Sequence, residues 1–125
     1  MTRDLRWLRD SFRAIDRVYF SDSLTERGVT IGWMRWQPLK RKFTFGMCPP
    51  GRILINQALA HDWVPDYVVL GTIYHEQLHE ILGPDHDHQF LTAEQRFPHY
   101  AQANAWEDAH LDDVIAASKP VFGRE

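Results

Sequence analysis

The chain has 125 residues, of which 44% are hydrophobic and 25% are charged, and its formal net charge is −3. This length suits one domain with a single core, and the composition excludes an intrinsically disordered chain. The one cysteine, Cys48, excludes an internal disulfide and a zinc ribbon made of four thiolates, and it suits a reducing compartment. We therefore expect a single folded domain over residues 1–125.

The charges are unevenly distributed along the chain. Residues 1–60 carry eleven Lys and Arg against five Asp and Glu, whereas residues 61–125 carry three against twelve. A basic half of this kind can face DNA or RNA, although solvated surfaces produce the same pattern. The N-terminus is charged with no apolar segment behind it, which argues against a signal peptide, and the longest apolar run is too short to span a bilayer. We expect a cytoplasmic protein without membrane contact.

The predicted elements begin with an amphipathic helix between residues 4 and 22, where apolar residues recur at steps of mostly three and four. Three strands follow in residues 29–36, 42–48 and 52–56, where β-formers alternate with smaller residues. Turns at Gln37-Pro38 and at Pro49-Pro50-Gly51 separate these strands. The simplest arrangement is an antiparallel three-stranded meander.

A long helix is predicted from near Pro65 to Leu82, with Pro65 at its first position and Gly83-Pro84 as its stop. Residues 87–118 predict one or two further helices, with a break at Pro98. The order of a helix, then strands, then helices indicates an α+β fold.

The long helix carries the pattern H-E-x-x-H in His75-Glu76-Gln77-Leu78-His79. Residues four apart lie on the same face of a helix, so His75 and His79 can bind one tetrahedral zinc ion. Glu76 is then placed to take a proton from zinc-bound water, whose pKa the ion lowers to about 7. The pattern therefore predicts a Zn²⁺ site with Glu76 as the general base.

A catalytic zinc needs a third protein ligand and one open position. His86 and His88 follow the helix at a usable distance, and the residues alone leave the choice between them open. Asp85 and Asp87 could accept the second ring N–H of a ligand histidine, or they could cap the helix that begins nearby.

Several segments around this motif belong to one pattern. They are Tyr19-Phe20-Ser21-Asp22-Ser23-Leu24 after the first helix, Val29-Thr30-Ile31-Gly32-Trp33, Thr44-Phe45-Gly46, Ile53-Leu54-Ile55-Asn56-Gln57-Ala58-Leu59, the H-E-x-x-H helix, and His86 four residues before Phe90. From about Leu5 to Leu91 the chain resembles the SprT-like zinc metallopeptidases, which include Spartan-type proteases acting on DNA–protein crosslinks, and the related YgjP-like proteins. The resemblance implies a minimal zincin-like domain that cleaves peptide bonds, with His86 as the third ligand.

The sequence departs from the family at two points. Glu80 stands where the family often has alanine or leucine, and a cysteine-based DNA-binding module is missing. Contact with DNA would then fall to the basic half, where the resemblance places one cluster beside the active-site cleft: Arg35, Lys40, Arg41 and Lys42. Trp36 could stack on single-stranded bases or pack in the core, and core packing is the main interpretation of Trp33.

Two other functions stay open. A non-catalytic, zinc-stabilised binding module would use both His86 and His88 as ligands and leave no open position. The segment from Leu78 to His86 also resembles YbeY-type metal-dependent endoribonucleases, which carry H-G-x-x-H and end in Asp-His. Glu76 in place of that glycine, and a spacing one residue longer, favour the peptidases. Tyr74 and Tyr100 could stabilise an oxyanion or could simply pack.

Overall fold

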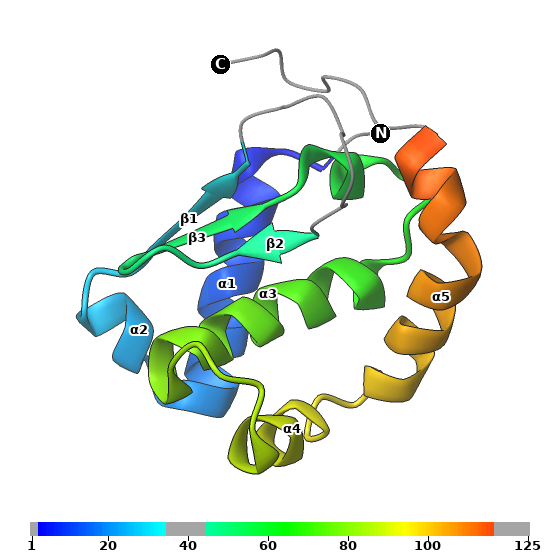
Figure 1. Ribbon diagram of the computed structural model, residues 1–125. Helices are drawn as coiled ribbons and strands as arrows, with labels where there is room; N and C mark the ends of the chain where they lie inside the picture. The colour runs from blue at the N-terminus through cyan, green and yellow to red at the C-terminus, as the bar shows by residue number, and fades with distance from the viewer. Residues whose placement is uncertain (1–2, 35–44, 117–125) are drawn as a thin grey trace.

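The computed structural model describes residues 3–34 and 45–116, in which helices pack against a small three-stranded sheet (Figure 1). The elements are α1 (Leu5–Phe20), α2 (Ser23–Glu26), β1 (Thr30–Trp33), β2 (Gly46–Met47), β3 (Arg52–Ile55), a 3-10 turn (Gln57–Ala60), α3 (Asp66–Leu82), α4 (His88–Glu94) and α5 (Tyr100–Ala116). The predicted α+β class is confirmed. None of the helices in these two ranges is long and apolar enough to cross a lipid bilayer.

The sheet is mixed, with the strand order β1-β3-β2. β1 runs parallel to β3, with Ile31 opposite Ile53, and β2 runs antiparallel to β3, with Gly46 opposite Ile55. The predicted antiparallel meander is therefore wrong for β1 and correct only for the β2–β3 hairpin. Alternation of side chains marks a strand but contains no information about its direction or its neighbours. β1 and β2 are separated by far more chain than a tight hairpin uses, so β3 can lie between them.

The first helix forms as its amphipathic pattern predicts. Leu8, Phe12 and Ile15 are buried against the rest of the core, and the arginines of the opposite face are exposed. The Asp4 carboxylate caps the helix by accepting a hydrogen bond from the Trp7 N–H at 2.8 Å. α1 packs against β1 and α3, so it closes the core on the side away from α5.

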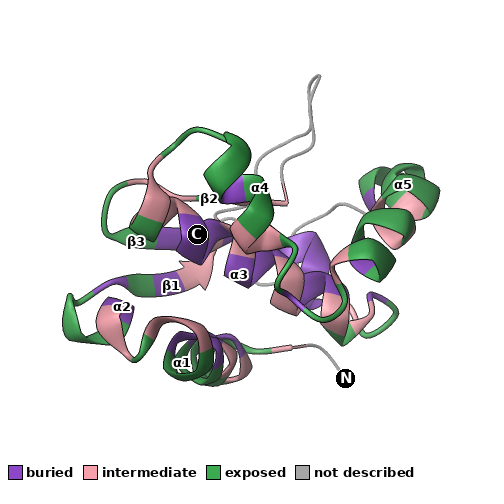
Figure 2. Cartoon of the chain, turned by 90° about the horizontal axis from the view of Figure 1, so that it is seen from below, coloured by how far each residue is buried: buried purple, intermediate pink, exposed green. Residues whose placement is uncertain are grey.

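The helix α3 runs through the middle of the protein, between α1 and the sheet on one side and α5 on the other (Figures 1 and 2). Pro65 caps the helix rather than forming its first turn, and Gly83 ends it at φ 93°, a conformation that glycine adopts without strain. Because neighbours enclose α3, even its polar residues Glu76 and Gln77 are buried. The predicted helix over residues 65–82 is confirmed.

After α3 the chain turns through a short loop into α4, and Pro98 separates α4 from α5 as predicted. α4 packs on α3 near its C-terminal end, and α5 packs along α3 from Tyr100 onward. The two helices therefore border the segment of α3 that carries the H-E-x-x-H pattern.

Candidate metal centre

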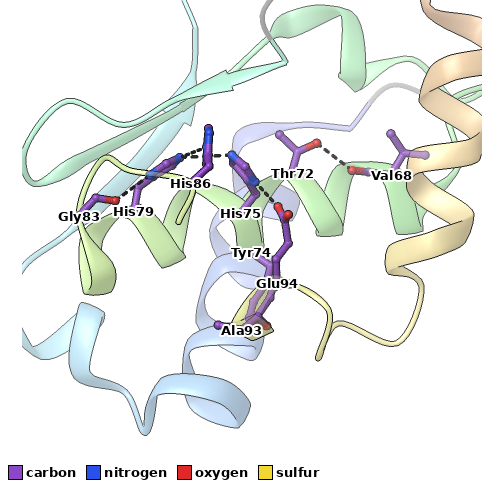
Figure 3. A network of polar contacts seen from close by, with 9 residues as sticks. All are labelled: Val68, Thr72, Tyr74, His75, His79, Gly83, His86, Ala93 and Glu94. Carbon is purple, nitrogen blue, oxygen red and sulfur yellow. Dashed lines mark hydrogen bonds and ion pairs between the residues drawn. The ribbon is translucent and has the colours of Figure 1, made fainter. Parts of the chain in front are cut away.

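Three histidines converge at the C-terminal half of α3 (Figure 3). His75 and His79 lie one turn apart on the helix, and His86 approaches from the loop between α3 and α4. One ring nitrogen from each of the three lies within 4.8 Å of the others, which is the arrangement of a group that can hold a metal ion. His88 is an exposed residue in the first turn of α4 and is not part of this group.

The spacing of the nitrogens fits a tetrahedral ion. His79 Nε2 lies 3.2 Å from His75 Nε2 and 3.0 Å from His86 Nε2. Zinc at about 2.0–2.1 Å from each nitrogen sets neighbouring ligand nitrogens roughly 3.3 Å apart. Three such lone pairs repel one another unless a cation lies between them, so the donor set itself suits a divalent ion.

The other ring nitrogens of the two helical histidines are already engaged. His79 Nδ1 donates a hydrogen bond to the Gly83 carbonyl oxygen at 2.9 Å, and His75 Nδ1 donates one to the Glu94 carboxylate. A proton on Nδ1 leaves the Nε2 lone pair available for a metal. The contacts thus select the tautomer that a metal ligand requires.

The buried ring of Phe90 supports all three imidazoles. Its centroid lies 5.0 Å from that of His75, 4.6 Å from that of His79 and 4.9 Å from that of His86. Phe90 is fully buried, so its position is set by the core. The three imidazoles therefore pack on the same buried side chain.

Two further contacts hold α4 in place. The Tyr74 hydroxyl donates to the Ala93 carbonyl oxygen at 2.6 Å, and the Asp87 carboxylate caps α4 by accepting from the Phe90 N–H at 2.9 Å. Asp87 therefore caps α4, and Glu94 is the carboxylate that accepts the hydrogen bond from the second ring nitrogen of His75. The sequence had made Asp85 and Asp87 candidates for both roles. The sequence pattern did not identify Glu94, whose only signal is its place one turn beyond Phe90 on a short helix.

The pKa values of His75 and His86 are shifted in opposite directions. Burial lowers the pKa of His75, but the hydrogen bond to Glu94 and the nearby carboxylates outweigh burial, so its pKa lies above the usual value. Burial, followed by the charges of the other two imidazoles, lowers the pKa of His86. The lowered value favours the neutral ring, which is the form that binds metal.

Glu76 is a buried carboxylate beside the histidine group. Burial raises its pKa to about 7, with His75 opposing the shift and Glu94 adding to it. The backbone of Gly46 in β2 passes directly over it, because a Cβ atom at Gly46 would lie 3.0 Å from Glu76 Cγ and Oε2. A glycine at this position therefore gives Glu76 its space.

A cleft of about 950 Å³ opens along the same face of α3. β2 and its flanking residues form one wall, and α5 forms the other. Its lining residues include Phe45, Gly46, Met47, Cys48, Thr72, His75, Glu76, His79, Glu80, His86, Glu94, Tyr100, Asn104 and Glu107. Lys and Arg are absent from the lining that the described residues form, so the cleft is acidic apart from the histidines.

Glu80, which departs from the family pattern, has a structural role in the cleft wall. Its Oε1 accepts hydrogen bonds from the Gly51 N–H at 2.8 Å and from Cys48 Sγ at 3.2 Å, which ties α3 to the β2–β3 turn. Burial and then Glu80 raise the pKa of the Cys48 thiol to about 12. Cys48 is half-buried, and its thiol donates a hydrogen bond to Glu80.

Other candidate residues fall outside the centre. Tyr74 and Tyr100 both line the cleft, and the Tyr74 hydroxyl already donates a hydrogen bond to the Ala93 carbonyl oxygen of α4. Trp33 is half-buried and packs against the core. The predicted nucleic-acid contacts Arg35, Lys40, Arg41 and Lys42, together with Trp36, lie outside the described residues.

No protein-family model matches this sequence, and a search of curated proteins finds no match either. The membership of the SprT-like family therefore stays a prediction that depends on the motifs and on the geometry of the histidine group.

The histidine group predicts one zinc ion per chain in protein purified without an affinity tag. We expect His86→Ala to lower zinc affinity by more than about 100-fold, because it removes a direct ligand and not an outer partner. His88→Ala is the matched control and should keep the affinity of the wild type. Zinc content by elemental analysis and a competition titration with a chromophoric chelator measure both, and equal loss in the two variants would contradict the assignment.

The contact between Glu94 and His75 predicts a second, smaller effect. Glu94→Ala should lower zinc affinity by roughly 10–100-fold, since the ring of His75 loses the acceptor that orients it. Glu94→Gln should lose less, because the amide oxygen can still accept from Nδ1. The same competition titration measures these affinities, with Gln95→Ala as the control from the exposed neighbouring position. An unchanged affinity in Glu94→Ala would remove Glu94 from the centre.

Proposed function

We propose that this chain is a zinc-dependent, peptidase-like hydrolase of the SprT-like type. The observation that carries the proposal is the convergence of His75 and His79 from α3, His86 from the loop that follows, and the buried Glu76 in the lining of one cleft. A zinc ion held by the histidines supplies a Lewis acid that lowers the pKa of a water molecule to about 7 and polarises a carbonyl oxygen.

The residues of the chain supply the remaining steps. His75, His79 and His86 fix the position of the ion, and Glu94 and Gly83 keep the rings of His75 and His79 in the required tautomer. The Glu76 carboxylate takes a proton from the attacking water and can pass it to the departing amine nitrogen. The Glu76 side chain is buried beneath the backbone of Gly46 and lines the cleft, which limits the positions that its carboxylate can adopt.

The geometry favours catalysis over a purely structural zinc site. A structural site is closed by four protein ligands, whereas the group found among residues 3–34 and 45–116 has three. The buried Glu76 also has no role in a structural site. Its presence at this position, where YbeY-type endoribonucleases have glycine, favours the peptidase over the endoribonuclease as well.

The shape of the cleft supports a peptide as the substrate. Its volume of about 950 Å³ is large enough for several residues of an extended chain. In the described sheet, β2 is an edge strand that forms one wall of this cleft, and an extended peptide can pair with such an edge through its main chain.

The base assignment predicts a separation between metal binding and turnover. Glu76→Gln should keep zinc affinity close to that of the wild type but lower the rate of peptide cleavage by about 100-fold or more, since the amide cannot take the proton. Cleavage of a quenched fluorescent peptide library measures the rate, and elemental analysis confirms the metal. A variant that turns over peptides at the wild-type rate would refute the role of Glu76.

Association with DNA is a second part of the proposal, and α1 provides an observation in its favour. Exposed arginines follow one side of the helix at spacings of three and four, with Asp10 as the one exposed carboxylate of α1: Arg6, Arg9, Arg13 and Arg17. Such a stripe suits a phosphate backbone. The substrates would then be proteins associated with DNA.

This part predicts that the protein binds a single-stranded oligonucleotide with an affinity that falls more than about tenfold between 50 and 200 mM salt, roughly as counterion release requires. The double variant Arg9→Gln, Arg13→Gln should bind more weakly, whereas Arg96→Gln, an exposed arginine beyond α4, should bind like the wild type. Fluorescence anisotropy over a salt series tests both statements. Binding that is absent, or insensitive to salt, would remove DNA as a partner.

A further inference from the structure

The helix α5 presents a polar stripe to the cleft. Tyr100, Asn104 and Glu107 line it, and their spacing of four and three places them on the same face of the helix. Within the described parts of the chain, the side chains of these three residues make no hydrogen bond or ion pair. The wall opposite β2 therefore holds polar groups that the fold itself does not use.

Glu107 differs from the other carboxylates of the cleft. Glu80 accepts hydrogen bonds from Gly51 and Cys48, and Glu94 accepts one from His75. Glu107 is half-buried and lines the same cleft, and the described residues provide no such donor to it. A carboxylate removed from part of its water without a compensating donor is unfavourable, so a ligand that supplies the donor gains free energy by binding there.

The chemistry of the cleft decides which ligand fits. Lys and Arg are absent from the cleft lining that the described residues form, and His75 is the described basic side chain that interacts electrostatically with Glu107. An anionic group would be repelled by the carboxylates around it. A second metal ion is not indicated either, because the described residues contain one metal-compatible group and Glu107 is not in it. An organic cation remains, since it can donate charge-assisted hydrogen bonds to a single carboxylate.

We infer that Glu107 is a specificity-determining residue that binds a cationic amine of the peptide substrate within the cleft. This inference depends on the proposed hydrolase function and names its substrate class. The amine has two sources in a peptide, the free α-amino group and the side chain of lysine. The first source would make the protein favour the ends of peptide chains, and the second would make it favour lysine near the cleaved bond.

Four small hydroxamates separate these sources without any need for turnover. They are the hydroxamates of lysine, norleucine, Nα-acetyl-lysine and Nα-acetyl-norleucine. In each probe the hydroxamate binds the metal ion. Binding to the zinc-loaded protein is measured by calorimetry at about pH 7.5, where both kinds of amine carry substantial positive charge. If Glu107 binds the α-amino group, the hydroxamates of lysine and norleucine should bind about tenfold more tightly than their acetylated counterparts. If it binds the lysine side chain, the two lysine compounds should bind about tenfold more tightly than the two norleucine compounds.

The variants assign the preference to one side chain. Glu107→Gln keeps the shape but removes the charge, and it should abolish the tenfold preference while it leaves the affinity for Nα-acetyl-norleucine hydroxamate unchanged. Asp108→Asn is the matched control, because it removes one negative charge from the exposed neighbour on α5, which does not line the cleft. It should keep the full preference. Thermal melting of both variants checks that the fold is retained.

Each outcome has a separate meaning. Equal binding of all four hydroxamates to the wild type overturns the role of Glu107 and leaves the hydrolase proposal intact. A preference that survives in Glu107→Gln, or is lost equally in Asp108→Asn, also overturns it. If none of the four binds, the metal-dependent function fails and the inference fails with it. An amine preference that depends on Glu107, in a protein that cleaves no peptide, supports the cation site and refutes the peptidase activity.

Discussion

The buried ring of Phe90 is the contact on which the arrangement of the three histidines depends. Two of the three histidines come from successive turns of α3, and their relative position follows from the helix alone. The third, His86, lies beyond the end of that helix, so the geometry of α3 alone does not fix its position. All three imidazoles pack on Phe90, so this one core side chain places His86 of the loop close to His75 and His79 of the helix.

The short helix α4 connects this centre to the hydrophobic core. A helix of seven residues is not stable by itself, so its position must come from its contacts. Asp87 caps its first turn, Tyr74 holds Ala93 near its end, and Glu94 reaches back to His75. The same helix therefore carries a core residue and a partner of a candidate ligand. Binding of a metal ion and local folding of residues 83–97 should strengthen each other as a result.

The parts of the structure that follow from local periodicity could be predicted from the sequence. The amphipathic pattern of α1, the stop at Gly83 and the break at Pro98 are all local, and so is the one-turn spacing of His75 and His79. Each predicted strand contains an observed one, although residues 35–36 and 42–44 of the predicted strands lie outside the described residues, and the parallel pairing of β1 was not predicted. Which strands become neighbours depends on contacts far apart in the sequence, and an alternating pattern does not record them.

The same distinction applies within the site. The residues alone left His86 and His88 as equal candidates, and the packing on Phe90 explains why the structure brings His86 into the group. The contact of Glu94 with His75 and the place of Glu107 in the cleft lining were not predicted, because both follow from the way α4 and α5 pack on α3. A carboxylate on a helix looks the same in the sequence whether it faces solvent or a cleft. Gly46 was matched to the family, but its function of making room for Glu76 needed the distance between them.

The hydrogen bond between Cys48 and Glu80 has a consequence for the redox behaviour of the protein. The thiolate is the form of cysteine that reacts with peroxide and alkylating agents and that binds soft metals. With a pKa of about 12, the sulfur of Cys48 stays protonated under physiological conditions, although it lines the same cleft as the histidines. This sulfur atom should therefore resist oxidation, and the group that could hold a metal ion among the described residues consists of imidazole nitrogens. Such a centre would keep its donor set under oxidative conditions that dismantle sites built from cysteine.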